Sequence, residues 1–205
     1  MPKVKLTKGE LKKQRDALKQ YERYLPTLQL KKQQLQLEIH RQTAILEEKT
    51  RLNDEKEKAI AAWARLLAEP GVDMRSWIAP EKIVTGAKNI AGVDLPVFDR
   101  VEFTPPEYDM FITPLWVDPA VEELRELVSM REEIKIAEED VRILKRELRV
   151  TTQRVNLFEK IKIPSAKEAI RLIKIYIGDQ MANAVGRSKI AKRKIEEFVL
   201  REMAV

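Results

Sequence analysis

The chain has 205 residues and a formal net charge of +6, with 35% charged and only 6% aromatic residues. This composition is typical of long solvent-exposed helices and argues against a compact enzyme. The sequence contains no cysteine, which excludes disulfides, zinc–thiolate sites and cysteine nucleophiles. No apolar run reaches the roughly 18 residues that a membrane-spanning helix needs, so we expect a cytoplasmic protein without direct membrane insertion.

Proline divides the sequence into three segments. Seven of the ten prolines lie between Pro70 and Pro119, and the flanking stretches contain only Pro26 and Pro164 besides Pro2. Because proline interrupts helices, the two flanking stretches are predicted to be helical and the middle one to be irregular. The predicted domains are an N-terminal helix over 1–68, an insert over 69–118 and a C-terminal helix over 119–205.

Apolar residues repeat every seven positions in the first segment, in two series three residues apart. The first series is Leu11, Leu18, Leu25, Lys32, Ile39, Leu46, Asn53, Ile60 and Leu67, and the second is Gln14, Tyr21, Leu28, Leu35, Gln42, Lys49, Lys56 and Trp63. This pattern predicts the contact seam of a coiled coil. Its polar middle, at Lys49, Asn53 and Lys56, is expected to be exposed and weakly paired.

The last segment carries a second, almost unbroken seam. Its members are Leu127, Met130, Ile134, Ala137, Val141, Leu144, Leu148, Thr151, Val155 and Phe158. Such a stripe needs a partner, and the first helix is available when the chain turns back. We therefore predict an all-α fold: a long antiparallel two-helix coiled coil with a small irregular or β-hairpin insert. Leu46, Ile60, Ile134 and Val141 should be buried in it, and the regular seam should end at Phe158.

The insert differs from both flanks in its residue types. The stretch Lys82–Phe103 is rich in β-branched and aromatic residues, which favours two short strands with a turn near Ala91–Gly92. Asp118 precedes Pro119, which predicts an N-cap followed by proline in the first turn of the next helix.

Charge is distributed unevenly along the sequence. Residues 1–32 carry a balance of +7 and residues 151–205 one of +6, whereas the insert carries −5. An antiparallel hairpin brings both basic segments to one end, which should meet a negative partner; the alternative is a merely solvated helix end. The candidate partner-binding cations are Lys12, Lys13, Arg187, Lys189, Lys192, Arg193 and Lys194.

The sequence offers no catalytic constellation. None of the six glycines belongs to a phosphate-binding pattern, and acidic pairs such as Glu122–Glu123 fall on predicted helix surfaces. We expect no catalytic residue, no cofactor and no metal site.

Three stretches carry a family resemblance. The sequences "QRVNLFEKIKIP" and "IRLIKIYIGDQMANAVGRSKIAKRKIE", together with "KNIAGVDLPVF" in the insert, resemble the D subunit of the V-type (vacuolar/archaeal-type) ATPases and ATP synthases, in its bacterial branch. An RVN…E…IP signature is fitted by Arg154, Val155, Asn156, Glu159, Ile163 and Pro164. "RYLPTLQLKKQQL" departs at Pro26 from the N-terminal run of better-known members.

The resemblance implies a non-catalytic rotor shaft. Its open end would enter the catalytic-head hexamer, the small F subunit of the stalk would bind lower down, and its base would rest on the protein linking the stalk to the membrane ring. The alternative is a free-standing coiled-coil adaptor that binds nucleic acid through the basic end; the shaft interpretation predicts no nucleic acid. Under this interpretation the protein is peripheral to the membrane.

The two internal prolines predict a junction. An antiparallel hairpin places Pro164 opposite residues 23–26, so we expect a bend or loosened turn in both helices there. Arg154 and Asn156 flank the seam residue Val155 and should point outward, as candidates for binding a partner.

Overall fold

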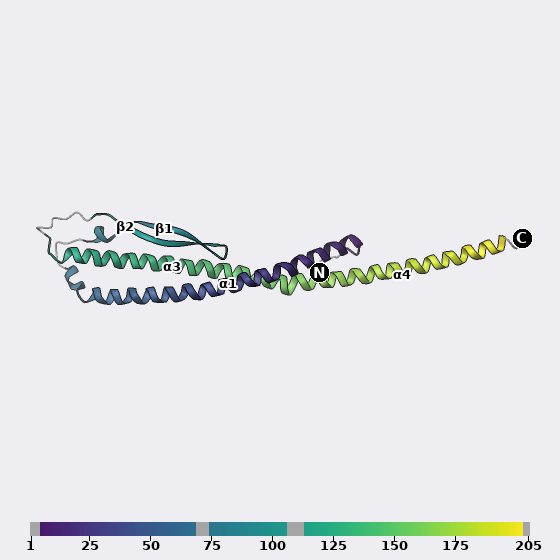
Figure 1. The fold of residues 1–205 in the computed structure, drawn as a ribbon, viewed down its shortest axis with the longest axis horizontal. Helices are drawn as coiled ribbons and strands as arrows, with labels where there is room; N and C mark the ends of the chain where they lie inside the picture. Colours follow the sequence, from purple (N-terminus) through teal and green to yellow (C-terminus); the bar gives the residue numbers. More distant parts are fainter. Residues whose placement is uncertain (1–4, 69–73, 106–112, 203–205) are drawn as a thin grey trace. The chain divides into compact units, whose positions relative to one another are not determined.

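The computed structural model describes residues 5–68, 74–105 and 113–202, and it is mostly helical with one β-hairpin (Figure 1). The described chain forms two units, a central unit over Lys31–Thr151 and a terminal unit of Met1–Leu30 with Thr152–Val205. The boundaries of these units do not coincide with those of the three predicted domains, and the division into those domains remains a prediction. The elements are α1 (Lys8–Ala61), the 3₁₀ helix η1 (Ala64–Ala68), α2 (Arg75–Ile78), β1 (Pro80–Ile90), β2 (Val93–Phe103), α3 (Val117–Leu157), the π-helix η2 (Phe158–Lys162) and α4 (Ile163–Glu202).

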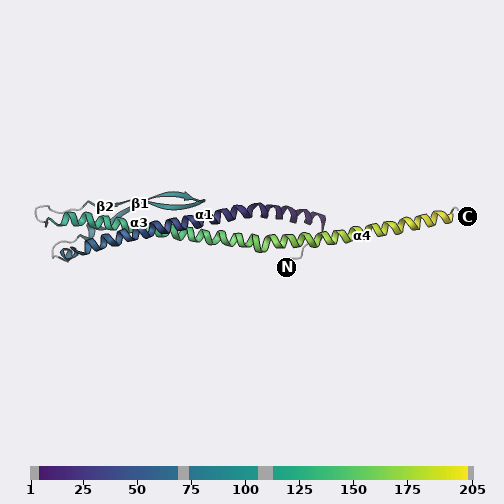
Figure 2. The same cartoon turned by 60° about the horizontal axis from the view of Figure 1, so that its bottom comes forward.

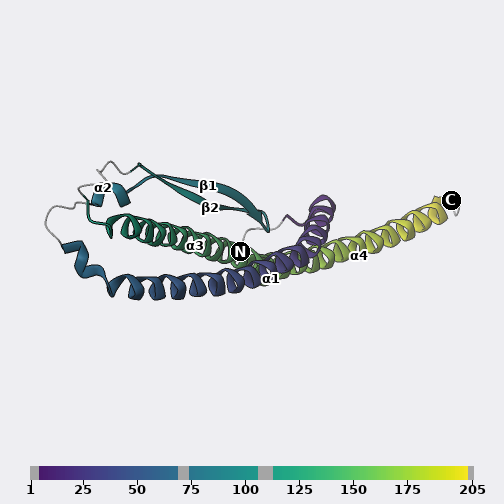
Figure 3. The same cartoon turned by 60° about the vertical axis from the view of Figure 1, so that its left-hand side comes forward.

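In the central unit, α1 and α3 lie side by side and antiparallel, as the three views agree (Figure 1, Figure 2 and Figure 3). Ion pairs connect the two helices, and from Lys31 to Lys56 the partner numbers fall on α3 as they rise on α1. They are Lys31–Glu147 at 3.3 Å, Lys49–Glu133 at 2.5 Å, Lys56–Glu123 at 2.5 Å, Lys56–Glu126 at 2.6 Å and Glu57–Arg131 at 2.6 Å. The long helices and the hairpin are therefore confirmed, whereas coiled-coil packing remains a prediction.

The heptad positions of α1 and η1 coincide with the burial pattern. Every position of both series, from Leu11 to Leu67, is buried or half-buried. Of the four seam residues singled out from the sequence, Ile60 and Val141 are buried and Leu46 and Ile134 are half-buried.

The expectation of an exposed polar middle was wrong. Asn53 is only 7% exposed, and Lys49 and Lys56 are half-buried. Lysine has a long aliphatic stem that can cover apolar surface while its ammonium group reaches a carboxylate, and both ammonium groups reach glutamates of α3. The Asn53 Nδ2 donates to Glu57 Oε1 at 3.1 Å.

The β-hairpin turns where the sequence predicts, at Ala91–Gly92. Both residues have positive φ, 53° and 73°, as the commonest two-residue hairpin turns require. The Asn89 side chain closes the turn, since its Oδ1 accepts from the Gly92 N–H at 3.1 Å and its Nδ2 donates to Asp94 Oδ1 at 2.6 Å. The strands are not short, however: each has 11 residues.

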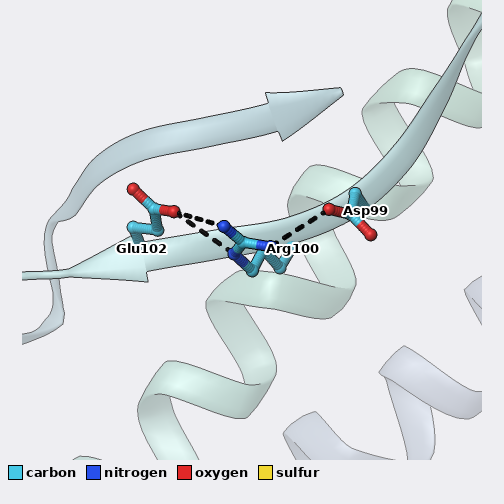
Figure 4. A network of polar contacts seen from close by, with 3 residues as sticks. All are labelled: Asp99, Arg100 and Glu102. Atoms are coloured by element: carbon cyan, nitrogen blue, oxygen red, sulfur yellow. Dashed lines mark hydrogen bonds and ion pairs between the residues drawn. The ribbon is translucent and has the colours of Figure 1, made fainter. Parts of the chain in front are cut away.

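A β-bulge interrupts the hairpin near its middle. Val84 pairs with Arg100 and Thr85 with Phe98, so Asp99 is the extra residue. Figure 4 shows Arg100 between two carboxylates, 3.3 Å from Asp99 and 2.9 Å from Glu102. These side chains are exposed, so their pairing orients Arg100 more than it stabilises the fold.

Two buried clusters hold the central unit together. Leu35 of α1, Leu95 of β2 and Leu144 of α3 form one of them and are 0–2% exposed. The other gathers Met74, Val117, Ala120 and Val121, and five partly buried residues pack against it. These are Trp63, Leu67, Trp77, Trp116 and Leu124. The hairpin is thus clamped to both helices by Leu95.

Arg125 of α3 fastens the other end of the hairpin. Its Nε donates to the Trp77 carbonyl at 2.8 Å and its Nη2 to the Thr104 carbonyl at 2.6 Å. The guanidinium lies 5.1 Å from the centre of the Phe103 ring. The helix that carries Arg125 begins at Val117, so Asp118 lies in its first turn and is not the predicted N-cap.

Arg125→Lys should lower the free energy of unfolding by about 1–3 kcal/mol, because an ammonium group cannot reach both carbonyls in the fork geometry of guanidinium. Urea unfolding followed by tryptophan fluorescence would measure this, since all three tryptophans belong to the neighbouring cluster. Arg142→Lys is the matched control, because Arg142 is exposed and pairs only with Glu139 among the described residues. Equal effects of both substitutions would contradict the prediction.

In the terminal unit, the N-terminal part of α1 contacts α4 and the π-helix. Tyr21 packs edge-on against Phe158, with ring centroids 5.3 Å apart, and Glu22 pairs with Lys167 at 3.3 Å. These contacts fall on either side of Pro164, which therefore lies near the level of residues 21–22. That level is about one turn from the predicted one.

Candidate functional site

The loosened turn occurs in one helix only. Immediately before Pro164, the π-helix Phe158–Lys162 replaces the α pattern, and the Ile163 N–H bonds to the Phe158 carbonyl five residues back. Proline has no N–H to donate, which favours such rearrangement. In α1 no loosened turn forms, because this helix runs unbroken through Pro26, and a bend at Pro26 stays a prediction. There the Thr27 hydroxyl donates to the Tyr24 carbonyl at 2.8 Å.

The π-helix shifts the buried stripe by one residue. A π turn accommodates one residue more than an α turn, so positions beyond it are displaced by one in the heptad count. The buried or half-buried residues there are Ile163, Ala166, Ala169, Ile170, Ile173 and Ile177. All of them except Ala169 lie one residue beyond the position that counting from Val155 and Phe158 gives. The buried stripe therefore continues past Phe158 in a shifted frame, and only its regular heptad register ends there.

Arg154 and Asn156 are exposed, while Val155 between them is only 4% exposed. Their outward orientation is as predicted. Among the described residues neither side chain makes a hydrogen bond or an ion pair that would hold it to the helices. Both are therefore available to a partner at the last turn before the π-helix.

The C-terminal part of α4 is a helix without a neighbour in the described chain. All residues from Gly178 to Val199 are exposed, and within the terminal unit α4 continues beyond the start of α1 (Figure 1). The ion pair of Glu22 with Lys167 explains this, because it fixes how far α1 extends along α4. Since α1 begins at Lys8, it ends before it reaches the last turns of α4. We call residues 178–199 the free segment.

An apolar stripe runs along the free segment, and sequence reasoning missed it. At 100° per residue, the buried stripe of Ile170, Ile173 and Ile177 continues along the same face, where its members are exposed. They are Met181, Ala184, Ala191, Ile195 and Phe198, with the polar Ser188 between Ala184 and Ala191 on the same face. In the sequence, these residues follow one another at alternating steps of three and four. They do not continue the heptad count from Val155 and Phe158, because the π-helix shifts that count by one residue.

Three of the predicted cations flank this stripe. By the same rotation of 100° per residue, Arg187 and Lys194 lie beside it on one side and Lys192 on the other, whereas Lys189 lies further round the helix and Arg193 on the opposite face. All five are exposed. Lys192 and Arg193 pair with glutamates four residues on, at 3.8 and 3.1 Å, and the Arg187 Nε donates to the Asn183 carbonyl.

Lys12 and Lys13 are exposed as well, but they lie elsewhere in the terminal unit. Ten residues separate Lys12 from Glu22, and the ion pair of Glu22 with Lys167 therefore places Lys12 near the level of residue 177. At 1.5 Å per residue, the free-segment cations begin about 15 Å further along α4. The expected proximity of the two groups of cations is thus not observed.

Two absences hold for residues 5–68, 74–105 and 113–202. No group of three or more potential metal-ligating side chains comes together there. No helix within those ranges combines the length and apolar character needed to cross a bilayer.

Comparison with known proteins identifies the family. The family model described as the D subunit of ATP synthase matches residues 10–193. The chain belongs to this family. It is 45% identical to the V-type ATP synthase D subunit of Borreliella burgdorferi, over 95% of this chain and 96% of the relative. It is 34% identical to the protein of the same name from Chlamydia trachomatis, over 95% and 97%, and 37% identical to that from Chlamydia abortus, over 95% and 94%. The family predicted from the RVN…E…IP signature is confirmed.

Proposed function

We propose that this chain is the central rotor-stalk component of a V-type ATPase or ATP synthase and transmits torque between the catalytic head and the membrane rotor. Its relatives are named as D subunits of V-type ATP synthases. A shaft needs stiffness, which buried seams supply over many helical turns. It contributes no catalytic residue and works in the complex on the cytoplasmic side of the membrane.

The observation that carries this proposal is the free segment of α4. An exposed apolar stripe flanked by cations is typical of a surface that packs against an apolar lining with acidic or polar groups at its margins. The catalytic-head hexamer is the partner that the family implies for this end. Met181, Ile195 and Phe198 would pack inside it, and the five cations would face its lining.

Two further partners follow from family membership. The small F subunit of the stalk would bind the shaft, and Arg154 and Asn156 are candidate contacts because they project beside the π-helix. The protein that links the stalk to the membrane ring would hold the base of the shaft. The alternative of a free-standing adaptor that binds nucleic acid could use the same cations, but the match to the ATP synthase D subunit model over residues 10–193 favours the stalk role.

A crosslink between the free segment and the head tests the proposal. The chain has no cysteine, so Ser188→Cys creates a single thiol in the middle of the stripe. A cleavable bifunctional reagent that joins this thiol to the head should stop ATP-driven turnover, and cleavage should restore it. A monofunctional reagent controls for modification itself. Full turnover in the crosslinked complex, or failure of the chain to copurify with an ATPase, would overturn the proposal.

Replacing the five free-segment cations by glutamine should weaken assembly with the head at least about fivefold, because exposed charge pairs contribute roughly 0.2–1 kcal/mol each. The difference from the unaltered chain should shrink as salt is added, since ions screen exposed charges. Titration of the head with labelled chain at several salt concentrations measures both effects.

A set of five exposed cations on α3 provides a matched control. Two of them pair with a nearby glutamate on their own helix, as two of the free-segment cations do. The set is Lys135, Arg142, Lys145, Arg146 and Arg149. If its replacement by glutamine weakens head assembly equally, the free segment has no special role.

A further inference from the structure

A pocket of about 240 Å³ lies between the β-hairpin and the helices α1 and α3 of the central unit. Ile90, Val97 and Phe98 cover it from the two strands, and Asp140 lines it from α3. The Oδ1 atom of Asp140 is buried and has no hydrogen-bond partner among the described residues. A buried acceptor without a donor is costly when it is charged.

The charged groups around Asp140 do not compensate it. Lys49 of α1 lines the same pocket, but its ammonium group is 2.5 Å from Glu133 of α3. Lys88 of β1 also lines the pocket and forms no ion pair with Asp140, and the lining residues of β2 carry no charge. Burial and then the neighbouring Glu139 raise the pKa of Asp140 from 3.8 to about 6, and Lys49 opposes this only partly.

We propose that the β-hairpin is a pH-sensitive strap, which closes over the protonated Asp140 and loosens when this carboxyl group ionises. Opening of the hairpin lets water reach the carboxylate, whereas closure strips that water away without supplying a donor. Protonation removes the charge and therefore removes the cost of closure. The contacts of Leu95 and Arg125 fasten the hairpin at two other places, so loosening is expected mainly over the pocket.

The pH range follows from the direction of the shift. The closed hairpin binds the proton of Asp140 more tightly than an open hairpin with an ordinary aspartate, so acid favours closure. The strap is weakest above pH 6 and tightens as the pH falls from about 6 toward 3.8. Glu57 and Glu168 have pKa values lowered by hydrogen bonds from arginines and lose their contributions at more acidic pH.

Amide hydrogen exchange of β1 and β2 in the full chain tests the strap. Asp140→Asn keeps the shape of the side chain and removes its charge at every pH. The hairpin amides of the variant should exchange more slowly than those of the unaltered chain at pH 7.5. That advantage should fall about 25-fold at pH 4.5, because a carboxyl group with a pKa of about 6 in the closed hairpin and 3.8 in the open one is ionised at pH 7.5 and largely protonated in the closed hairpin at pH 4.5. Comparison at equal pH cancels the intrinsic pH dependence of exchange.

Glu138→Gln is the control, because Glu138 is exposed on the same helix two residues away. It should leave the hairpin exchange unchanged at both pH values. An advantage of Asp140→Asn that is absent, or equal at pH 4.5 and 7.5, would overturn the proposal, as would the same behaviour in Glu138→Gln. The isolated chain suffices for this experiment, so its outcome is independent of the role proposed in the ATPase.

Discussion

Leu35→Ala should lower the free energy of unfolding of the chain by about 2–5 kcal/mol, the range for large-to-small substitutions in a packed core. Leu35 is fully buried and forms one cluster with Leu95 and Leu144. Its truncation removes apolar contacts and leaves a cavity that a helix, a strand and a second helix share. The strand has the fewest other anchors, so the hairpin should also lose protection from amide exchange.

Leu37→Ala is the matched control for this substitution. Leu37 lies two residues further along α1, carries the same side chain and is 71% exposed, so its truncation should change stability by less than about 0.5 kcal/mol. Urea unfolding followed by circular dichroism measures both variants. Similar losses for Leu35 and Leu37 would mean that the seam of α1 does not face α3 in the way described.

Local sequence patterns were sufficient for the features that depend on a regular backbone. The heptads of α1 predicted the buried face from Leu11 to Leu67, and Ala91–Gly92 was placed in the turn. Asn53 and its lysine neighbours were misjudged because residue type was taken to decide exposure. Lys49 and Lys56 pair with glutamates of α3, and Asn53 donates to Glu57 of its own helix. These three positions therefore remain part of the buried seam although their side chains are polar.

Features that depend on a change of backbone geometry could not be read by counting. The count of seven assumes a constant number of residues per turn, and the π-helix before Pro164 violates that assumption. Ile170, Ile173 and the apolar stripe of the free segment therefore fell outside the predicted seam, and only the cations of that segment were recognised. The pocket around Asp140 lay equally beyond prediction, because it unites residues that are distant in the sequence.

Deleting Lys160 together with Pro164→Ala should leave the stability of the terminal unit within about 1 kcal/mol of its present value. The deletion removes the extra residue that the π turn holds, so Ala166, Ile170 and Ile173 return to the frame of Val155 in an ordinary α-helix. Pro164 must be replaced as well, because proline within a continuous α-helix costs about 3 kcal/mol. Thermal unfolding followed by circular dichroism measures the result.

Adding one alanine after Lys160, in the same Pro164→Ala background, is the opposite change at the same place. It turns the rest of α4 by a further 100° and carries Ile170 and Ile173 away from α1. Each buried isoleucine contributes roughly 1.5–3 kcal/mol, so the insertion should cost at least about 3 kcal/mol where the deletion costs little. Equal losses would show that the π turn does not set the frame of the seam.

If the deletion variant is stable and assembles but couples ATP hydrolysis poorly to rotation, the π turn acts as the junction between shaft and free segment. Unchanged coupling would reduce it to a tolerated irregularity.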